Sequence, residues 1–185
     1  MSEEELSKKR AIEFWDTGKI NEIEIGTYKG LADIHKYLFQ DVFPFAGEMR
    51  KVNIAKDNFS FAQLIFLPTN LKIIDNLPHK TFEEIIEKYA SMNVAHPFCE
   101  GNGRSMRIWL NLMLKDSLGV CVGWEKIGKV DYLQAMRRST YKTLELEALL
   151  QEALTDKIND REVYMKGIQV SYDYEGQNGI DIHDL

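Results

Sequence analysis

The chain contains 185 residues with a formal net charge of −6, 44% hydrophobic residues and two cysteines. A chain of this length favours one domain with a full hydrophobic core. The negative charge and the lack of a long basic run argue against direct nucleic-acid binding. No apolar stretch approaches the roughly 18 residues of a membrane span, and the polar start Met1–Glu5 is not a secretory signal, so we expect a cytoplasmic protein that binds no membrane.

Apolar residues recur mostly at helical spacing, which predicts a mainly α fold. A first helix is expected at Leu6–Trp15, with Gly18 after it, and a second at Lys29–Phe39. Phenylalanines between Val52 and Leu67 predict a short β-hairpin, at about Ile54–Phe66. The further predicted helices are, in chain order, 71–77, a long helix from Thr81 toward Val94, 103–117, 131–138, 144–154 and 160–174.

These elements are expected to form a single domain over 1–185. Its core would cover about 20–155, followed by a C-terminal helix at about 160–176 and a loose tail at 177–185. The two cysteines make no zinc pattern with the four scattered histidines, so no structural zinc is expected.

The stretch 96–107 reads His-Pro-Phe-Cys-Glu-Gly-Asn-Gly-Arg-Ser-Met-Arg and opens one of the predicted helices. A helix start offers unpaired backbone N–H groups to an anion, and Gly101 and Gly103 let the backbone approach it closely. Arg104 and Arg107 lie three apart on one helical face, so each guanidinium can bind phosphate oxygens. The pattern therefore predicts a site for a polyphosphate.

Two other groups in this stretch suit phosphate chemistry. Glu100 supplies a hard oxygen ligand for Mg²⁺, which usually takes one or two protein carboxylates beside phosphate oxygens and water. His96 is a proton acceptor whose ordinary pKa lies near physiological pH. A hydroxyl that attacks a phosphorus atom needs such a base on one side and cations on the other.

The stretch 96–107 resembles the signature of the Fic (Fido-domain) family, H-x-F-x-[D/E]-G-N-G-R-x-x-R, and fills every fixed position. Residues 38–54 also resemble the region that usually precedes it, so the resemblance covers at least 30–120. It implies a Fic-type helical domain with a β-hairpin flap beside the active site. The implied activity is transfer of AMP from ATP to a Tyr, Thr or Ser hydroxyl of a target protein, with release of pyrophosphate.

The resemblance also implies roles for individual residues. His96 would be the catalytic base, and Mg²⁺ on Glu100 would bridge the α- and β-phosphates. The backbone N–H groups of 101–104, together with the Asn102 amide, would cradle the phosphates. Arg104 would bind the β-phosphate and Arg107 the γ-phosphate.

In relatives of this family the hairpin is a flap that pairs with an extended segment of the target, as a sheet edge pairs with an added strand. Lys56, at its turn, is expected to reach a nucleotide phosphate or the target. Phe59 and Phe61 suit this role and simple coverage of the core equally well.

The segment Ser171–Gly176 resembles the family's inhibitory motif [S/T]-x-x-x-E-[G/N], in the class that carries it on a C-terminal helix (class III). Ser171 and Glu175 share a helical face, and Gly176 completes the motif. The resemblance implies that Glu175 pairs with Arg107 and occupies the place of the γ-phosphate. Tyr172 and Tyr174 lie in this motif just before Glu175, and AMP on either hydroxyl would loosen this helix.

Other functions remain open at the level of the sequence. The enzyme could move another phosphate-linked group, such as phosphocholine or UMP, or remove AMP from a modified protein, which would require Glu175. A non-enzymatic nucleotide-binding regulator would explain the C-terminal motif but would not explain the complete set of catalytic residues. A type II topoisomerase is a candidate target, because some bacterial members modify such enzymes. The oligomeric state and the base preference are not determined, and a homo-oligomer is one option.

Overall fold

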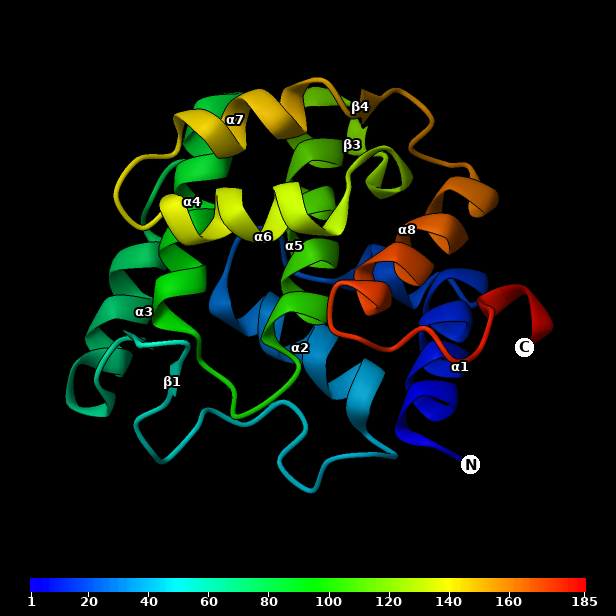
Figure 1. Cartoon of the computed structure of the whole chain (residues 1–185), viewed down its shortest axis with the longest axis horizontal. Helices are drawn as coiled ribbons and strands as arrows, with labels where there is room; N and C mark the ends of the chain where they lie inside the picture. Colours follow the sequence, from blue (N-terminus) through cyan, green and yellow to red (C-terminus); the bar gives the residue numbers. More distant parts are fainter.

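Helices form most of the protein, as the spacing of its apolar residues predicts (Figure 1). The computed structural model describes residues 1–185. The α-helices are α1 Glu3–Asp16, α2 Tyr28–Phe39, α3 Leu67–Asp75, α4 Phe82–Ala95, α5 Asn102–Leu118, α6 Lys129–Arg138, α7 Leu144–Gln151 and α8 Arg161–Asp173. The strands are β1 Ala55–Lys56, β2 Phe59–Ser60, β3 Cys121–Val122 and β4 Leu154–Thr155. They form two antiparallel pairs, β1 with β2 and β3 with β4.

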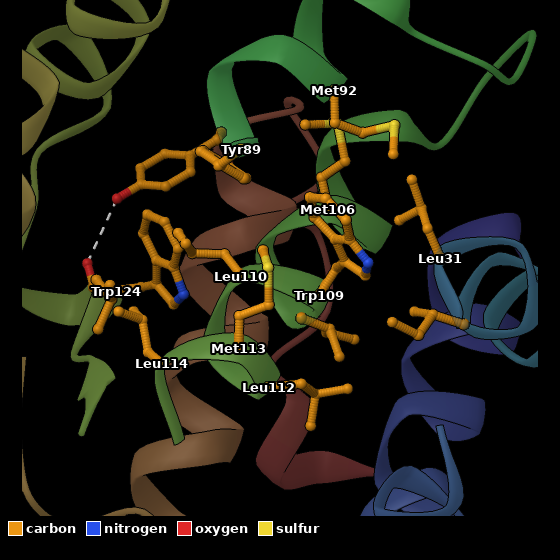
Figure 2. Close-up of a cluster of buried hydrophobic side chains, with 14 of the residues drawn as sticks. Leu31, Tyr89, Met92, Met106, Trp109, Leu110, Leu112, Met113, Leu114 and Trp124 are labelled. Carbon is orange, nitrogen blue, oxygen red and sulfur yellow. Dashed lines mark hydrogen bonds between the residues drawn. The ribbon is translucent and has the colours of Figure 1, made fainter. Parts of the chain in front are cut away.

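Helix α5 lies at the centre of the fold and packs against α2, α4 and α8 (Figure 1). Its side chains Met106, Trp109, Leu110, Met113 and Leu114 are buried in one hydrophobic cluster (Figure 2). A helix that is apolar around most of its circumference must be covered on several sides. This central position gives the N-terminal end of α5 a rigid support.

Local signals determine where α4 begins and ends and where α5 begins. Thr81 and Glu84 form a capping box at the start of α4. At its end, His96 adopts a left-handed backbone with φ 49°, which a non-glycine residue rarely does. Gly101, with φ 87°, is the N-cap of α5. Residues 96–101 therefore form a tight loop between two packed helices.

Several predicted boundaries differ from the structure, and three of the differences have a specific local reason. Helix α3 begins at Leu67 rather than at 71, because Pro68 stands in its first turn, where proline is tolerated. Helix α7 ends at Gln151, because Leu154 pairs with Val122 in a strand. The hairpin is shorter than predicted, since a 3₁₀ helix at Leu64–Phe66 follows it. None of the helices combines the length and apolar character needed to cross a lipid bilayer.

The predicted loose tail at 177–185 is packed instead, and both chain ends lie on the same side of the protein (Figure 1). Ile182 is fully buried within a short 3₁₀ helix. The buried Lys8 ammonium of α1 donates to the Ile180 carbonyl at 2.5 Å, and the Glu4 carboxylate accepts from the Ile180 N–H at 3.0 Å. These contacts join residues more than 170 positions apart, which local sequence signals do not reveal.

Candidate active site

The predicted site residues line one pocket of about 420 Å³ between the loop 96–101, the start of α5, the hairpin and α6. The predicted residues that line it are Lys56, His96, Glu100, Gly101, Asn102, Gly103, Arg104, Arg107 and Glu175. Ser171, on α8, and Gly176, just after it, lie outside this pocket lining. The predicted catalytic and phosphate-binding residues and the predicted inhibitory carboxylate therefore line the same pocket.

His96 is held as a neutral imidazole. Its Nδ1–H donates to the Asn93 carbonyl at 3.2 Å, which leaves Nε2 as an acceptor. The ring stacks on Phe61 with centroids 3.7 Å apart. Burial lowers the pKa of His96 to about 4, assisted by the charge of Arg50 and opposed by the bond to Asn93. The side chain is thus in the unprotonated form that a base requires.

The backbone at the start of α5 is suited to bind an anion. No side chain caps the helix at Gly101, so the first N–H groups have no helical partner. A Cβ on Gly101 would lie 2.6 Å from the Phe39 ring and 3.0 Å from His35 Nε2, so only glycine fits there. The Asn102 amide, predicted to contact phosphate, instead accepts from the Phe98 N–H at 3.0 Å and donates to the Phe98 carbonyl at 2.7 Å. This side chain fixes the loop, because both of its polar groups are used internally.

Arg107 is bound by three groups on α8 and the turn that follows it. Its Nε donates to the Ser171 hydroxyl at 2.7 Å, and its Nη2 donates to the Ser171 carbonyl at 2.9 Å and to Glu175 at 2.7 Å. Burial would raise the pKa of the Glu175 carboxyl, but the positive charge of Arg107 outweighs it and lowers that pKa. A Cβ on Gly103 would lie 2.5 Å from the Glu175 carboxylate, so this carboxylate lies directly over the start of α5.

Arg104 contacts both ends of the chain. Its Nη1 donates to the Gln177 side-chain oxygen at 2.6 Å and to the Glu3 carboxylate at 3.1 Å. Its guanidinium lies over the Phe39 ring, 4.6 Å from the centroid, and the Arg104 side chain is 2% exposed. The sequence predicts this arginine as a phosphate ligand and does not predict the contacts that hold it.

The hairpin forms one wall of the pocket. Asp57 and Asn58, both with positive φ, make its turn, and the exposed Lys56 lines the pocket. The Ala62 N–H donates to the Val94 carbonyl at 2.9 Å and ties the base of the hairpin to α4. Together with the stacking of Phe61 on His96, this contact couples the hairpin to the histidine.

Arg50 is a buried positioning residue without a proposed role at the level of the sequence. Its guanidinium donates to the carbonyls of His96 and Val52, both at 2.7 Å, to that of Ala95 at 3.0 Å, and to that of Ala62. These carbonyls belong to the end of α4 and to both sides of the hairpin base. Arg50 lies within the stretch 38–54, whose resemblance to the family assigns no role to any single residue.

His35 is a second positioning residue that sequence reasoning missed. Its Nε2–H donates to the Glu100 carbonyl at 2.8 Å, and its Nδ1 accepts from the Gly47 N–H at 2.9 Å. The ring is fully buried and stacks on Phe98 at 3.9 Å. Burial lowers its pKa to about 4. Its position beside Leu31, Ile34 and Leu38 on α2 indicated burial but not these bonds.

The prediction that Tyr172 or Tyr174 is modified does not fit this conformation. Their side chains are 1% and 4% exposed, and the Tyr174 hydroxyl donates to the Ile127 carbonyl at 2.7 Å. The Tyr172 ring lies between Lys8 of α1 and Arg104 of α5. The Tyr174 ring stacks on Tyr132 of α6 and packs against Trp124. Neither hydroxyl is reachable by a nucleotide unless α8 moves.

Comparisons with known proteins give the family and the fold of this chain. Residues 26–114 match the Fic/DOC family. The chain is 30% identical over 142 residues to "Protein adenylyltransferase VbhT" of Bartonella schoenbuchensis. This alignment covers 70% of this chain and 30% of that protein. It is 28% identical over 138 residues to "Probable protein adenylyltransferase Fic" of Salmonella typhimurium, and this alignment covers 68% of each protein.

Solved Fic-domain structures share the fold. The BepC protein of Bartonella tribocorum, solved with bound AMPPNP, has a TM-score of 0.64 at 19% identity and covers 82% of this chain and 83% of that one. The N-terminal FIC domain of Bep8 from Bartonella sp. 1-1C has a TM-score of 0.66 at 17% identity, with 85% and 88% covered. The solved structures show the same fold, and the family match over 26–114, the relatives and the complete signature at 96–107 show that this chain belongs to the Fic/DOC family.

Proposed function

We propose that this protein is a self-inhibited protein adenylyltransferase that moves AMP from ATP to a Tyr, Thr or Ser hydroxyl of a target protein. The observation that carries the proposal is the shared pocket: His96, the open start of α5, and Arg104 and Arg107 all line it. The names of the relatives, protein adenylyltransferases, support the same reaction.

The proposed reaction is a displacement at the α-phosphorus. The target hydroxyl attacks this atom, and its proton passes to His96 Nε2 as the new P–O bond forms. The bond from the α-phosphorus to the bridging oxygen breaks, and pyrophosphate leaves with the electron pair. Backbone N–H groups at the start of α5 bind the phosphates. Arg104 binds the β-phosphate, and Arg107 binds the γ-phosphate once Glu175 has left it.

Magnesium fits the donor groups of the pocket when ATP is its main ligand. The protein contains no cluster of three or more His, Cys, Asp or Glu side chains that would hold a metal without substrate. Glu100 lines the pocket and its side chain is 64% exposed, so one carboxylate is available. Mg²⁺ commonly binds through one carboxylate together with substrate phosphates and water. When bound, the ion would neutralise charge on the leaving pyrophosphate.

Inhibition follows from the same contacts. A carboxylate 2.7 Å from Arg107 and directly over the start of α5 competes with the γ-phosphate for that arginine. Its negative charge also repels a polyphosphate in the pocket. We propose that ATP binds productively only when Glu175 is displaced, which makes Ser171, Glu175 and Gly176 an inhibitory motif.

The proposed protein substrate binds along the hairpin. Strands β1 and β2 pair only with each other, so an outer edge is available to an extended target segment. Such pairing would bring a hydroxyl toward His96, on which Phe61 stacks. A type II topoisomerase is one target to include in assays.

The test measures transfer of label from α-³²P-ATP to protein with Mg²⁺, with and without cell lysate or purified topoisomerase. It compares the wild type with Glu175→Gly and with the double variant Glu175→Gly/His96→Ala. Label that increases with Glu175→Gly and disappears in the double variant supports the proposal. No label in any sample, with ATP still bound, would favour transfer of another group or a regulatory role. Loss of label from a pre-modified protein that depends on Glu175 would instead indicate removal of AMP.

A further inference from the structure

The two ends of the chain converge on Arg104. Nη1 of Arg104 donates to Gln177 and Glu3 at 2.6 and 3.1 Å, and the Gln177 amide donates to the same Glu3 oxygen at 3.2 Å. The three side chains thus form a closed triangle of polar contacts. Neither Glu3 nor Gln177 lines the 420 Å³ pocket, whereas Arg104 does. They therefore bind the arginine from outside the substrate space.

The other edge of the same guanidinium is free. Nε of Arg104 is buried without a hydrogen-bond partner, and the contact of Nη2 with Glu100 is long, at 3.8 Å. Nε and Nη2 form one edge of the planar group and donate in parallel, the geometry that binds two phosphate oxygens. The triangle thus uses Nη1 and leaves the two-donor edge without a close partner.

The segment that supplies Gln177 is itself anchored. The Glu4 carboxylate accepts from the N–H groups of Gly179 and Ile180, at 3.3 and 3.0 Å. Lys8 binds the Ile180 carbonyl, and the Ile182 N–H donates to the Gln169 side chain at 2.9 Å. Gln177 is therefore fixed between α1 and α8 rather than carried on a free end.

We infer that Glu3 and Gln177 are positioning residues that hold Arg104 so that its Nε–Nη2 edge is presented to the β-phosphate of the nucleotide. This inference rests on the proposed function, in which Arg104 binds that phosphate. It also distinguishes the two motif arginines: Glu175 blocks Arg107 from inside the pocket, whereas Gln177, two residues later, supports Arg104 from outside. Displacement of Glu175 alone removes the carboxylate from Arg107, which keeps its bonds to Ser171, whereas release of the whole C-terminal segment also loosens Arg104.

The test measures the affinities of ADP and AMP by calorimetry, with Glu175→Gly as the parent protein. AMP lacks the β-phosphate, so the ratio of the two affinities reports the contribution of Arg104. Gln177→Ala and Glu3→Ala are each expected to weaken ADP binding about fivefold or more and to leave AMP within about twofold. Glu5→Ala is the matched control, because Glu5 lies on the same helical turn and pairs with Lys9, away from Arg104.

A swapped variant provides the rescue. Glu3→Gln/Gln177→Glu keeps one carboxylate and one amide around Nη1 and is expected to restore most of the ratio. An unchanged ratio in both alanine variants, or an equal loss of ADP and AMP affinity, would overturn the inference. If the ratio falls as expected but the parent transfers no AMP from ATP, the positioning role stands and the proposed reaction fails.

Discussion

The Glu175 carboxylate lies 2.7 Å from the Arg107 guanidinium, whose side chain is only 3% exposed. Removal of one partner from such a pair leaves a buried charge without its counter-ion. The same contact therefore stabilises the fold and occupies an arginine that the proposed reaction needs. Stability and activity are expected to change in opposite directions when it is broken.

Glu175→Gly should accordingly be less stable and more active than the wild type. We expect unfolding free energy to fall by about 1–3 kcal/mol, since Arg107 keeps its bonds to Ser171. AMP transfer should rise at least tenfold. Urea unfolding and the α-³²P-ATP assay measure the two effects. A variant with lower stability and unchanged transfer would show that the pair is only structural.

Ser171→Ala should activate less than Glu175→Gly. The hydroxyl accepts from Arg107 Nε at 2.7 Å, and its loss leaves the carboxylate in place. We expect the loss of one hydrogen bond to destabilise the inhibited state by about 1 kcal/mol, which would increase AMP transfer roughly fivefold. Ser139→Ala is a suitable control, because Ser139 is also buried but bonds to the Met136 carbonyl. Equal activation by Ser139→Ala would remove the specific role of Ser171.

His96 should remain neutral well below its ordinary titration range. Burial lowers its pKa to about 4, whereas Asp181 and Glu162 raise the pKa of His183 above 6.5. In NMR titrations from pH 7.5 to 5, the His183 signals should shift and the His96 signals should stay nearly constant. The His96→Ala spectrum assigns the signals. A midpoint near 6.5 for His96 would contradict the expected desolvation of the ring.

His35 should make the fold less stable as the pH falls. Its pKa is about 4 in the folded protein, against 6.5 as its ordinary value, so between these values only the unfolded chain takes up the proton. This contribution to stability is complete above pH 6.5 and decreases toward pH 4. We expect a loss of about 1–2 kcal/mol between pH 7.5 and 5.

His35→Phe separates this effect from the other titrating groups. Urea unfolding of both proteins at several pH values gives, for each, the slope of the unfolding free energy against pH. The difference between the two slopes is the contribution of His35. The variant should be less stable at pH 7.5, because it lacks the bonds to Glu100 and Gly47, but its stability should depend less on pH. Identical slopes would show that His35 does not carry the expected pKa shift.

Arg50→Lys should impair both stability and transfer. One ammonium group cannot reach the carbonyls that the Arg50 guanidinium binds at the end of α4 and at the hairpin base. We expect a loss of about 2–4 kcal/mol in unfolding free energy. In the Glu175→Gly background, AMP transfer should fall at least tenfold, because the His96 backbone and the hairpin lose their common anchor.

Arg138→Lys is the control for Arg50→Lys. Arg138 is exposed and pairs with Glu145 on the surface, so its replacement should change stability by no more than about 0.5 kcal/mol. If Arg50→Lys lowered stability but left the kinetic constants for ATP and target unchanged, Arg50 would have no positioning role toward His96.

The sequence by itself determined the helical fold class, the start of α5 and the family. These features depend on signals within a few residues: helical spacing of apolar side chains, the capping residue Thr81, and the contiguous signature at 96–107. Even so, the sequence assigned the Asn102 amide to phosphate, whereas it closes the loop on Phe98. The motif does not specify whether this amide binds phosphate or the Phe98 backbone, because that choice depends on the conformation of the loop.

Only the tertiary structure decided which side chains support the site. Arg50 binds carbonyls up to 46 positions away, His35 reaches Glu100 across 65, and Arg104 meets Glu3 across 101. The 177–185 segment is packed rather than loose for the same reason, since its partners lie on α1. Such contacts arise when distant elements cover the central helix α5, because burial favours hydrogen-bond partners for polar groups, and no local pattern specifies these partners.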